Sequence, residues 1–234
     1  EVYEMTIESA IADVQANVGV AARHLITDEE VRHQADDLYF TASTLKVPPL
    51  VELYRQVDGG TVNPDARVEL TDRLRAPGSG VLKEMANGMS PTVHDLALLM
   101  IIISDNTATD HMIDRLGRDN VEASQARLGH SDPDLNIPFL TTREFWLLKF
   151  ALSPAEVAAY LELRSEGRRD FLDADLAGRH VRDAVANLAE WVAPVSIDSI
   201  EWFASPADLC RAMVWLHEAG STPGLEPVLD VLSI

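Results

Sequence analysis

The sequence is poor in cysteine, in basic residues and in long apolar runs. There is a single cysteine, Cys210, which excludes an internal disulfide. Cys210 lies on an apolar stripe with Met213 and Val214, so its thiol is more simply interpreted as a packed side chain than as a nucleophile. Lysine and arginine number 19 against 38 acidic residues, and the net charge of −19 argues against a nucleic-acid partner, because phosphate binding needs clustered cations. No apolar run approaches the roughly 20 residues that span a bilayer, so no transmembrane segment is expected.

The 234 residues have the composition of an ordinary globular chain, with 47% hydrophobic and 24% charged residues. A chain of this length can bury one core, so we expect a single domain over residues 1–234. The first residue is Glu1 and no leader peptide is visible, so the sequence neither shows nor excludes export. It also leaves the oligomeric state open.

The hydrophobic pattern predicts an α+β fold that is mostly helical. Residues 6–16 have helical spacing, and residues 18–24 and 31–36 alternate as the two strands of an antiparallel hairpin. A helix is predicted to start at Ser90-Pro91 and to run, fully buried, through the apolar stretch 96–103. Because a two-stranded sheet alone is marginal in water, further strands are expected, although none is obvious after residue 36.

Two short motifs bear residues that could carry chemistry. Ser43 lies three positions before Lys46 at a predicted helix start, so both side chains share a face and the lysine could take the serine proton. By itself such a pair is expected about once by chance in a chain of this length. The second motif, Ser104-Asp105-Asn106, directly follows the apolar stretch, where polar side chains are costly unless they are hydrogen-bonded.

Together, "YFTASTLK" and "IIISDNTATD" resemble the nucleophile helix and the second motif of the class A β-lactamases and penicillin-binding proteins. The separation of 61 residues between Ser43 and Ser104 is also what that family shows, and the resemblance runs from about residue 5 to residue 130. It implies an α+β fold with a helical cluster against an antiparallel sheet, of which only the N-terminal hairpin is evident in this chain.

The resemblance also implies a role for each motif residue. Ser43 would attack an amide carbonyl and carry the acyl-enzyme, and Lys46 would be its neutral base. Ser104 would relay a proton to the leaving nitrogen, and Asn106 would hydrogen-bond Lys46 and the substrate. The implied partner is a small-molecule β-lactam or a related amide or ester, with no cofactor. A secreted or extracytoplasmic location is expected if the protein follows the family.

Two other features of the family are altered or absent. The family's deacylating glutamate lies in a Glu-Pro-x-Leu-Asn pattern, and the nearest match is 132–136, which makes Asp132 a candidate base. A Pro-Asp turn is the alternative interpretation of that segment. The third motif, Lys-Thr-Gly, is missing, because none of the three lysines is followed by such a sequence. We therefore expect that the chain lacks a C-terminal part of the fold and carries a helical insertion at about 146–202.

Three functions remain open at this point. β-Lactam hydrolysis is the leading interpretation, and a carboxylesterase or peptidoglycan acyl transferase could use the same pair of residues. A β-lactam-binding or peptide-binding domain without turnover is the third, because the third motif is missing. Metal-dependent hydrolysis is disfavoured, since His94 and His111 form no ligand pair at a convincing spacing, so no metal site is expected.

Overall fold

The computed structural model describes residues 6–182, 184 and 195–233. A short N-terminal helix precedes a hairpin in which β1 pairs antiparallel with β2, with Val20 opposite His33 and Arg23 opposite Glu30. A second antiparallel pair joins β3 to β4 across most of the chain length. The strands are β1 (Val20–Arg23), β2 (Glu30–His33), β3 (Tyr39–Phe40) and β4 (Phe203–Ala204). The protein thus has the predicted α+β fold with small antiparallel sheets.

Helices make up most of the rest of the described chain. The α-helices are α1 (Ile7–Ile11), α2 (Val47–Asp58), α3 (Val93–Ile102), α4 (Asn106–Leu116), α5 (Arg118–Arg127), α6 (Thr142–Phe150), α7 (Pro154–Glu162), α8 (Ser165–Phe171), α10 (Pro206–Ala219) and α11 (Pro227–Leu232). Short 3₁₀ turns are η1 (Ala42–Lys46), η2 (Asp72–Leu74), η3 (Leu82–Glu84) and η4 (Pro133–Asn136), and η5 (Leu172–Leu176) is a π-helical turn.

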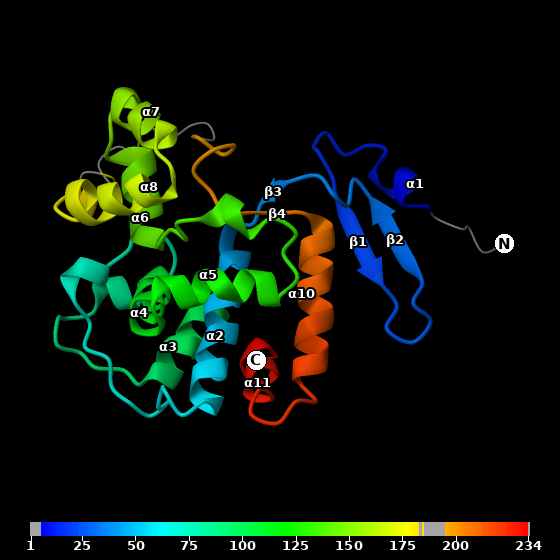
Figure 1. The fold of residues 1–234 in the computed structure, drawn as a ribbon, viewed down its shortest axis with the longest axis horizontal. Helices are drawn as coiled ribbons and strands as arrows, with labels where there is room; N and C mark the ends of the chain where they lie inside the picture. The colour runs from blue at the N-terminus through cyan, green and yellow to red at the C-terminus, as the bar shows by residue number, and fades with distance from the viewer. Residues whose placement is uncertain (1–5, 183, 185–194, 234) are drawn as a thin grey trace.

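The core lies where α2, α3, α4 and α5 pack against one another. Its fully enclosed side chains include Leu50, Leu53, Leu96, Met100 and Met112. Figure 1 shows α10 standing between these helices and the β1–β2 hairpin, while α6, α7 and α8 lie at the opposite end of the molecule. Burial of this apolar surface is the main stabilising contribution to the fold.

The apolar stretch 96–103 is only partly buried, which corrects the prediction of a fully buried helix. α3 begins at Val93, with Thr92 and Asp95 forming a capping box, two residues later than predicted from Ser90-Pro91. One face is buried in the core, but the side chains at 102 and 103 are 50% and 39% exposed. They lie at the end of the helix, where the chain turns away from the core toward Ser104.

The stretch 146–202 was predicted to be a helical insertion, of which residues 183 and 185–194 lie outside the described part of the chain. The described part begins within α6 and contains α7, α8 and η5. Tyr160 of α7 and Phe171 of α8 contact each other with ring centroids 5.4 Å apart. That this segment is an insertion relative to other members of the fold stays a prediction.

Within the described ranges, no helix is both long enough and apolar enough to cross a membrane.

Glu52 is a fully buried carboxylate that joins α2 to α5. Its oxygens accept hydrogen bonds from Arg55 Nη2 (2.6 Å), Gln56 Nε2 (2.8 Å), Ser124 Oγ (3.0 Å) and Arg127 Nη1 (3.3 Å). Burial raises the pKa of Glu52, but the hydrogen bonds outweigh it and the net shift is downward. The carboxylate is therefore charged at neutral pH and fully partnered.

Replacing Glu52 with alanine should lower the free energy of unfolding by about 3 kcal/mol, because donors in the core lose their acceptor. Urea unfolding at pH 7 measures this change, and Glu69→Ala, at an exposed position, should shift it by under about 0.5 kcal/mol. Since the folded-state pKa is lowered, the stabilisation is present above the unfolded pKa and is lost as the pH falls through the folded value. Equal effects of the two substitutions would contradict this interpretation.

Candidate active site

Ser43 lies on the 3₁₀ turn η1, directly after β3. The pairing of β3 with β4 and a hydrogen bond from Thr41 N to Trp202 O (2.8 Å) hold the start of this turn. Ala42 has a φ of +45°, so the backbone reverses sharply just before Ser43. Further strands were expected, but the sequence could not place these two, because two residues carry no alternating pattern.

The prolines after Lys46 do not break the helix that follows. The 3₁₀ turn ends at Lys46, and α2 begins as a new helix at Val47 with Pro48 and Pro49 in its first turn. Backbone N–H groups in the first turn of a helix have no intrahelical partner, so a proline there, which lacks an N–H, removes no helical hydrogen bond. The sequence therefore presents Ser43 and Lys46 on one short turn and continues into the core without a distorted helix.

The Lys46 ammonium lies at the centre of the predicted site. Lys46 is only 3% exposed, and its Nζ donates to Ser104 Oγ (2.8 Å) and Asn106 Oδ1 (3.0 Å). Its distance to Ser43 Oγ is longer, at 3.4 Å. Burial lowers the pKa of Lys46 to about 8, against the opposing effects of the Asp110 and Asp105 carboxylates.

Ser104 bridges Lys46 and Ser43. Its Oγ accepts from Lys46 Nζ and donates to Ser43 Oγ at 2.8 Å, so each hydrogen bond of the path through Ser104 is shorter than the direct 3.4 Å contact between lysine and serine. Ser104 has a φ of +56°, in the left-handed region that non-glycine residues seldom adopt. Ser79 Oγ supports this backbone by donating to the Ser104 carbonyl at 2.6 Å. Such strain at a polar cluster is typical of functional sites.

Asp105 and Asn106 hold the loop at 76–82 against the second motif. The Asp105 carboxylate caps α4 at Ala108 N (2.9 Å) and accepts from Val81 N (2.7 Å) and Leu82 N (2.9 Å). Asn106 Nδ2 donates to Pro77 O at 2.8 Å, while its Oδ1 accepts from the lysine. Asp105 thus braces the loop at 76–82.

Asp110 is a second buried acid close to the site. It is fully buried on α4, and its oxygens accept from Thr142 N (2.7 Å), Thr142 Oγ1 (2.7 Å) and Arg143 N (2.8 Å). Burial raises the pKa of Asp110 to about 7, although these hydrogen bonds act in the opposite direction. Asp110 therefore attaches the start of α6 to α4 and adds negative potential near Lys46.

Asp132 is not part of the hydrogen-bonded group around Ser43. Its side chain is exposed, and its backbone N–H donates to His130 Nδ1 at 3.1 Å. In the described residues no hydrogen bond joins its carboxylate to Ser43, Lys46 or Ser104. The end of the matched pattern, Asn136, is buried and donates to Gln125 Oε1 at 2.7 Å. A catalytic role for Asp132 stays a prediction that these contacts do not support.

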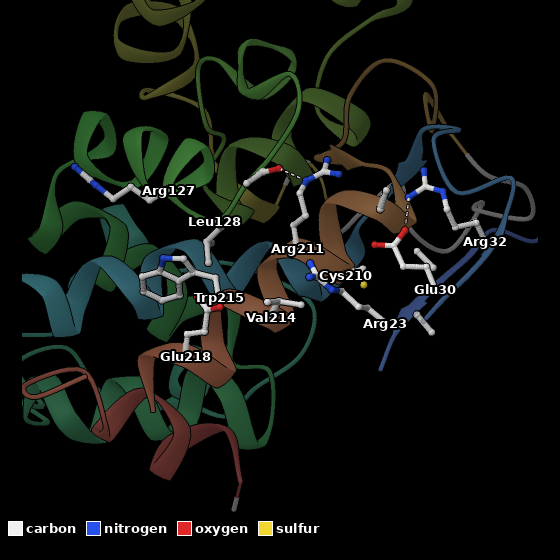
Figure 2. A pocket seen from close by; sticks show the side chains of 14 residues that line it. Arg23, Glu30, Arg32, Arg127, Leu128, Cys210, Arg211, Val214, Trp215 and Glu218 are labelled. Atoms are coloured by element: carbon white, nitrogen blue, oxygen red, sulfur yellow. Dashed lines mark hydrogen bonds and ion pairs between the residues drawn. The ribbon is translucent and has the colours of Figure 1, made fainter. Parts of the chain in front are cut away.

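A pocket elsewhere on the molecule lies between the hairpin and α10 (Figure 2). It has a volume of about 350 Å³, and none of the predicted site residues lines it. Its arginines are ion-paired: Arg23 with Asp28, Arg32 with Asp36, Arg127 with Glu52 and Arg211 with Asp208. Cys210 lines this pocket and is partly buried. The pocket has no hydrogen-bonded nucleophile and base, so the candidate active site stays with Ser43.

No group of three histidine, cysteine or acidic side chains suited to a metal ion occurs in the described part of the chain.

Sequence and structure comparisons both point to one family. The profile of the Beta-lactamase enzyme family matches residues 3–174. A β-lactamase from Sphaerobacter thermophilus DSM 20745 is similar in structure, with a TM-score of 0.63 and 27% identity over 96% of this chain and 66% of that one. No curated protein sequence matches.

Two further solved structures are similar in fold alone. One is a β-lactamase from Chitinophaga pinensis DSM 2588, with a TM-score of 0.60 and 16% identity over 94% of this chain and 65% of that one. The other is an ancestral class A β-lactamase, with a TM-score of 0.56 and 18% identity over 92% of this chain and 64% of that one. The chain thus spans about two thirds of the length of the structures it matches.

Proposed function

The chain belongs to the β-lactamase enzyme family, and from this we propose that it is a serine hydrolase that opens a β-lactam amide through an acyl-enzyme on Ser43. The observation that carries the proposal is the hydrogen-bonded path from Lys46 Nζ through Ser104 Oγ to Ser43 Oγ, with 2.8 Å at each step. A serine hydroxyl becomes an effective nucleophile when such a path leads to a base.

In the proposed acylation, neutral Lys46 receives the hydroxyl proton of Ser43 through Ser104. The Ser43 oxygen forms a bond to the β-lactam carbonyl carbon, and the ring C–N bond breaks. The same proton then returns from Lys46 through Ser104 to the leaving nitrogen, so the enzyme gains no net proton. The backbone N–H of Ser43, in the first turn of η1, would donate one hydrogen bond to the developing oxyanion.

Deacylation needs a base that activates a water molecule to attack the acyl-enzyme ester. Asp132 is the candidate from the sequence, but its carboxylate is exposed and lies outside the hydrogen-bonded group. We therefore propose that acylation is faster than deacylation, so that the acyl-enzyme accumulates. The same observation favours a second candidate function, a β-lactam-binding domain that forms a long-lived adduct without useful turnover.

Intact-mass spectrometry after incubation with benzylpenicillin tests the proposal. The expected result is a mass increase equal to that of the penicillin, lost in Ser43→Ala. Release of the adduct over minutes, together with turnover of a chromogenic cephalosporin, supports the hydrolase, whereas an adduct stable for hours supports the binding domain. Hydrolysis of simple esters with no β-lactam adduct would favour an esterase instead. Turnover that persists in Ser43→Ala would refute a mechanism based on this serine.

A further inference from the structure

A large cavity lies beside the candidate active site, on the far side of the loop at 76–78. It has a volume of about 1020 Å³ and lies between that loop, η3, Arg143 of α6 and residues 180–182. None of the predicted catalytic residues lines it. It shares no lining residue with the pocket in Figure 2.

The cavity is lined by more cations than acids, in a chain whose net charge is −19. The cations are Arg75, Lys83, Arg143 and Arg182, with His180 beside them, and the acids are Asp72 and Glu84. Asp72 is already paired with a cation, because Arg75 Nε donates to its Oδ1 at 2.9 Å. The cavity therefore keeps an excess of positive charge where most of the protein is negative.

Three of these cations form no salt bridge within residues 6–182, 184 and 195–233. Lys83 donates to the Gly78 carbonyl, and Arg143 Nη2 donates to the Arg179 carbonyl at 2.5 Å. Arg143 Nε is buried and has no hydrogen-bond partner in the described residues. Arg182 is exposed and forms no salt bridge there, and its charge contributes to lowering the pKa of Asp72. Lys83 and Arg143 are half-buried, and a half-buried cation without a counter-ion is costly unless an anion binds beside it.

The wall between the cavity and the active site is one backbone segment thick. Pro77 and Gly78 line the cavity, and on their other side Pro77 O accepts from Asn106 Nδ2 at 2.8 Å. A Cβ placed on Gly78 would lie 2.7 Å from Asn106 Nδ2 and 3.3 Å from Trp146 Nε1. The same asparagine contacts Lys46, so a substrate seated on Asn106 lies one backbone segment away from the cavity.

We propose that this cavity binds a negatively charged group on the acyl side of the substrate, which makes acyl groups bearing a carboxylate the preferred substrates. This inference rests on the proposed function, because it assumes that the substrate is attacked at Ser43. The strongly negative chain repels anionic ligands at long range, and a local group of cations offsets this repulsion at the point of binding. Lys83 and Arg182 are the specificity-determining residues, since both line the cavity and neither forms a salt bridge in the described part of the chain.

The test compares benzylpenicillin with its α-carboxy derivative, which differs only by one carboxylate on the acyl side chain. The expected result is acylation of Ser43 about tenfold faster with the α-carboxy derivative at pH 7.5 and low salt. The ratio should fall to about one in the double variant Lys83→Met/Arg182→Gln, and 0.5 M NaCl should lower it in the unchanged protein. Arg115→Gln is the control, because it removes one exposed cation that does not line the cavity.

Calorimetric binding of phenylmalonate, a dianion, against phenylacetate separates this proposal from the proposed function. Phenylmalonate should bind more tightly, and the double variant should abolish the difference even if no penicillin acylates Ser43, in which case only the proposed function fails. Acylation with equal rates for both penicillins, and equal binding of the two acids, would overturn the cavity proposal and leave the serine mechanism intact. Absence of both acylation and selective binding would overturn both.

Discussion

Replacing Lys46 with methionine is expected to lower the rate at which benzylpenicillin acylates Ser43 by about 10³-fold. The substitution keeps the apolar stem in its buried position but removes the base at the end of the path through Ser104. The second-order rate of adduct formation, followed by intact mass, measures the effect directly. Circular dichroism is the control that checks whether the variant keeps its helices.

The variant Lys46→Arg distinguishes two roles for Lys46: accepting a proton as a base, or acting only through its positive charge. Arginine stays protonated at any pH the protein survives, so it can hold Asn106 and Ser104 but cannot accept a proton. We expect Lys46→Arg to be as slow as Lys46→Met. An arginine variant that keeps more than a tenth of the original rate would show that Lys46 acts through its charge and not as a base.

The pH dependence of acylation provides a further readout of the same role. With its pKa lowered to about 8, about a tenth of Lys46 is neutral at pH 7 and about nine tenths at pH 9. Only the neutral form accepts a proton, so the rate should rise with pH through 8 and level off above it. The methionine variant should lack this rise. A flat profile between pH 6 and pH 9 in the unchanged protein would contradict the proposal.

The hydrogen-bonded group around Ser43 could be anticipated because each motif acts locally. Ser43 and Lys46 share one turn, and Ser104 and Asn106 flank the start of α4, so two short patterns place all four side chains once the family packing is given. The hairpin was likewise predicted, since strand alternation and a turn are local signals. The pairing of β3 with β4 was not, because it joins residues that are distant in sequence.

The surroundings of the site follow from tertiary packing that the sequence pattern does not encode. Ser79 and Lys83 lie on a loop whose course is set by the Asp105 carboxylate, and Trp146 reaches the same loop from α6. The one local signal was the pair of glycines at 78 and 80, which permit positive φ angles. The match at 132–136 continues from Asp132 into the turn η4, and Asn136 at its end donates to Gln125 Oε1, so a catalytic role for Asp132 stays a prediction.

Gly80→Ala is expected to disrupt the second motif although no catalytic group is changed. Gly80 has a φ of +101°, and a Cβ there would lie 2.2 Å from the Asp105 side chain and 2.5 Å from the Asp105 backbone. Asp105 would have to move, which breaks its hydrogen bonds to Val81 N and Leu82 N and displaces the adjoining Ser104 and Asn106. We expect acylation to slow by about 10²-fold and the free energy of unfolding to fall by about 3 kcal/mol.

Gly88→Ala is the matched control, because it imposes the same backbone strain without the clash. Gly88 has a φ of +84°, and a Cβ built there meets no atom within 4 Å. It should cost about 1 kcal/mol of stability and leave the acylation rate unchanged. The difference between the two variants, by urea unfolding and by adduct formation, isolates the contact with Asp105. If both variants acylate at the same rate, the glycine at 80 is needed only for its φ angle, and the loop does not hold the second motif in place.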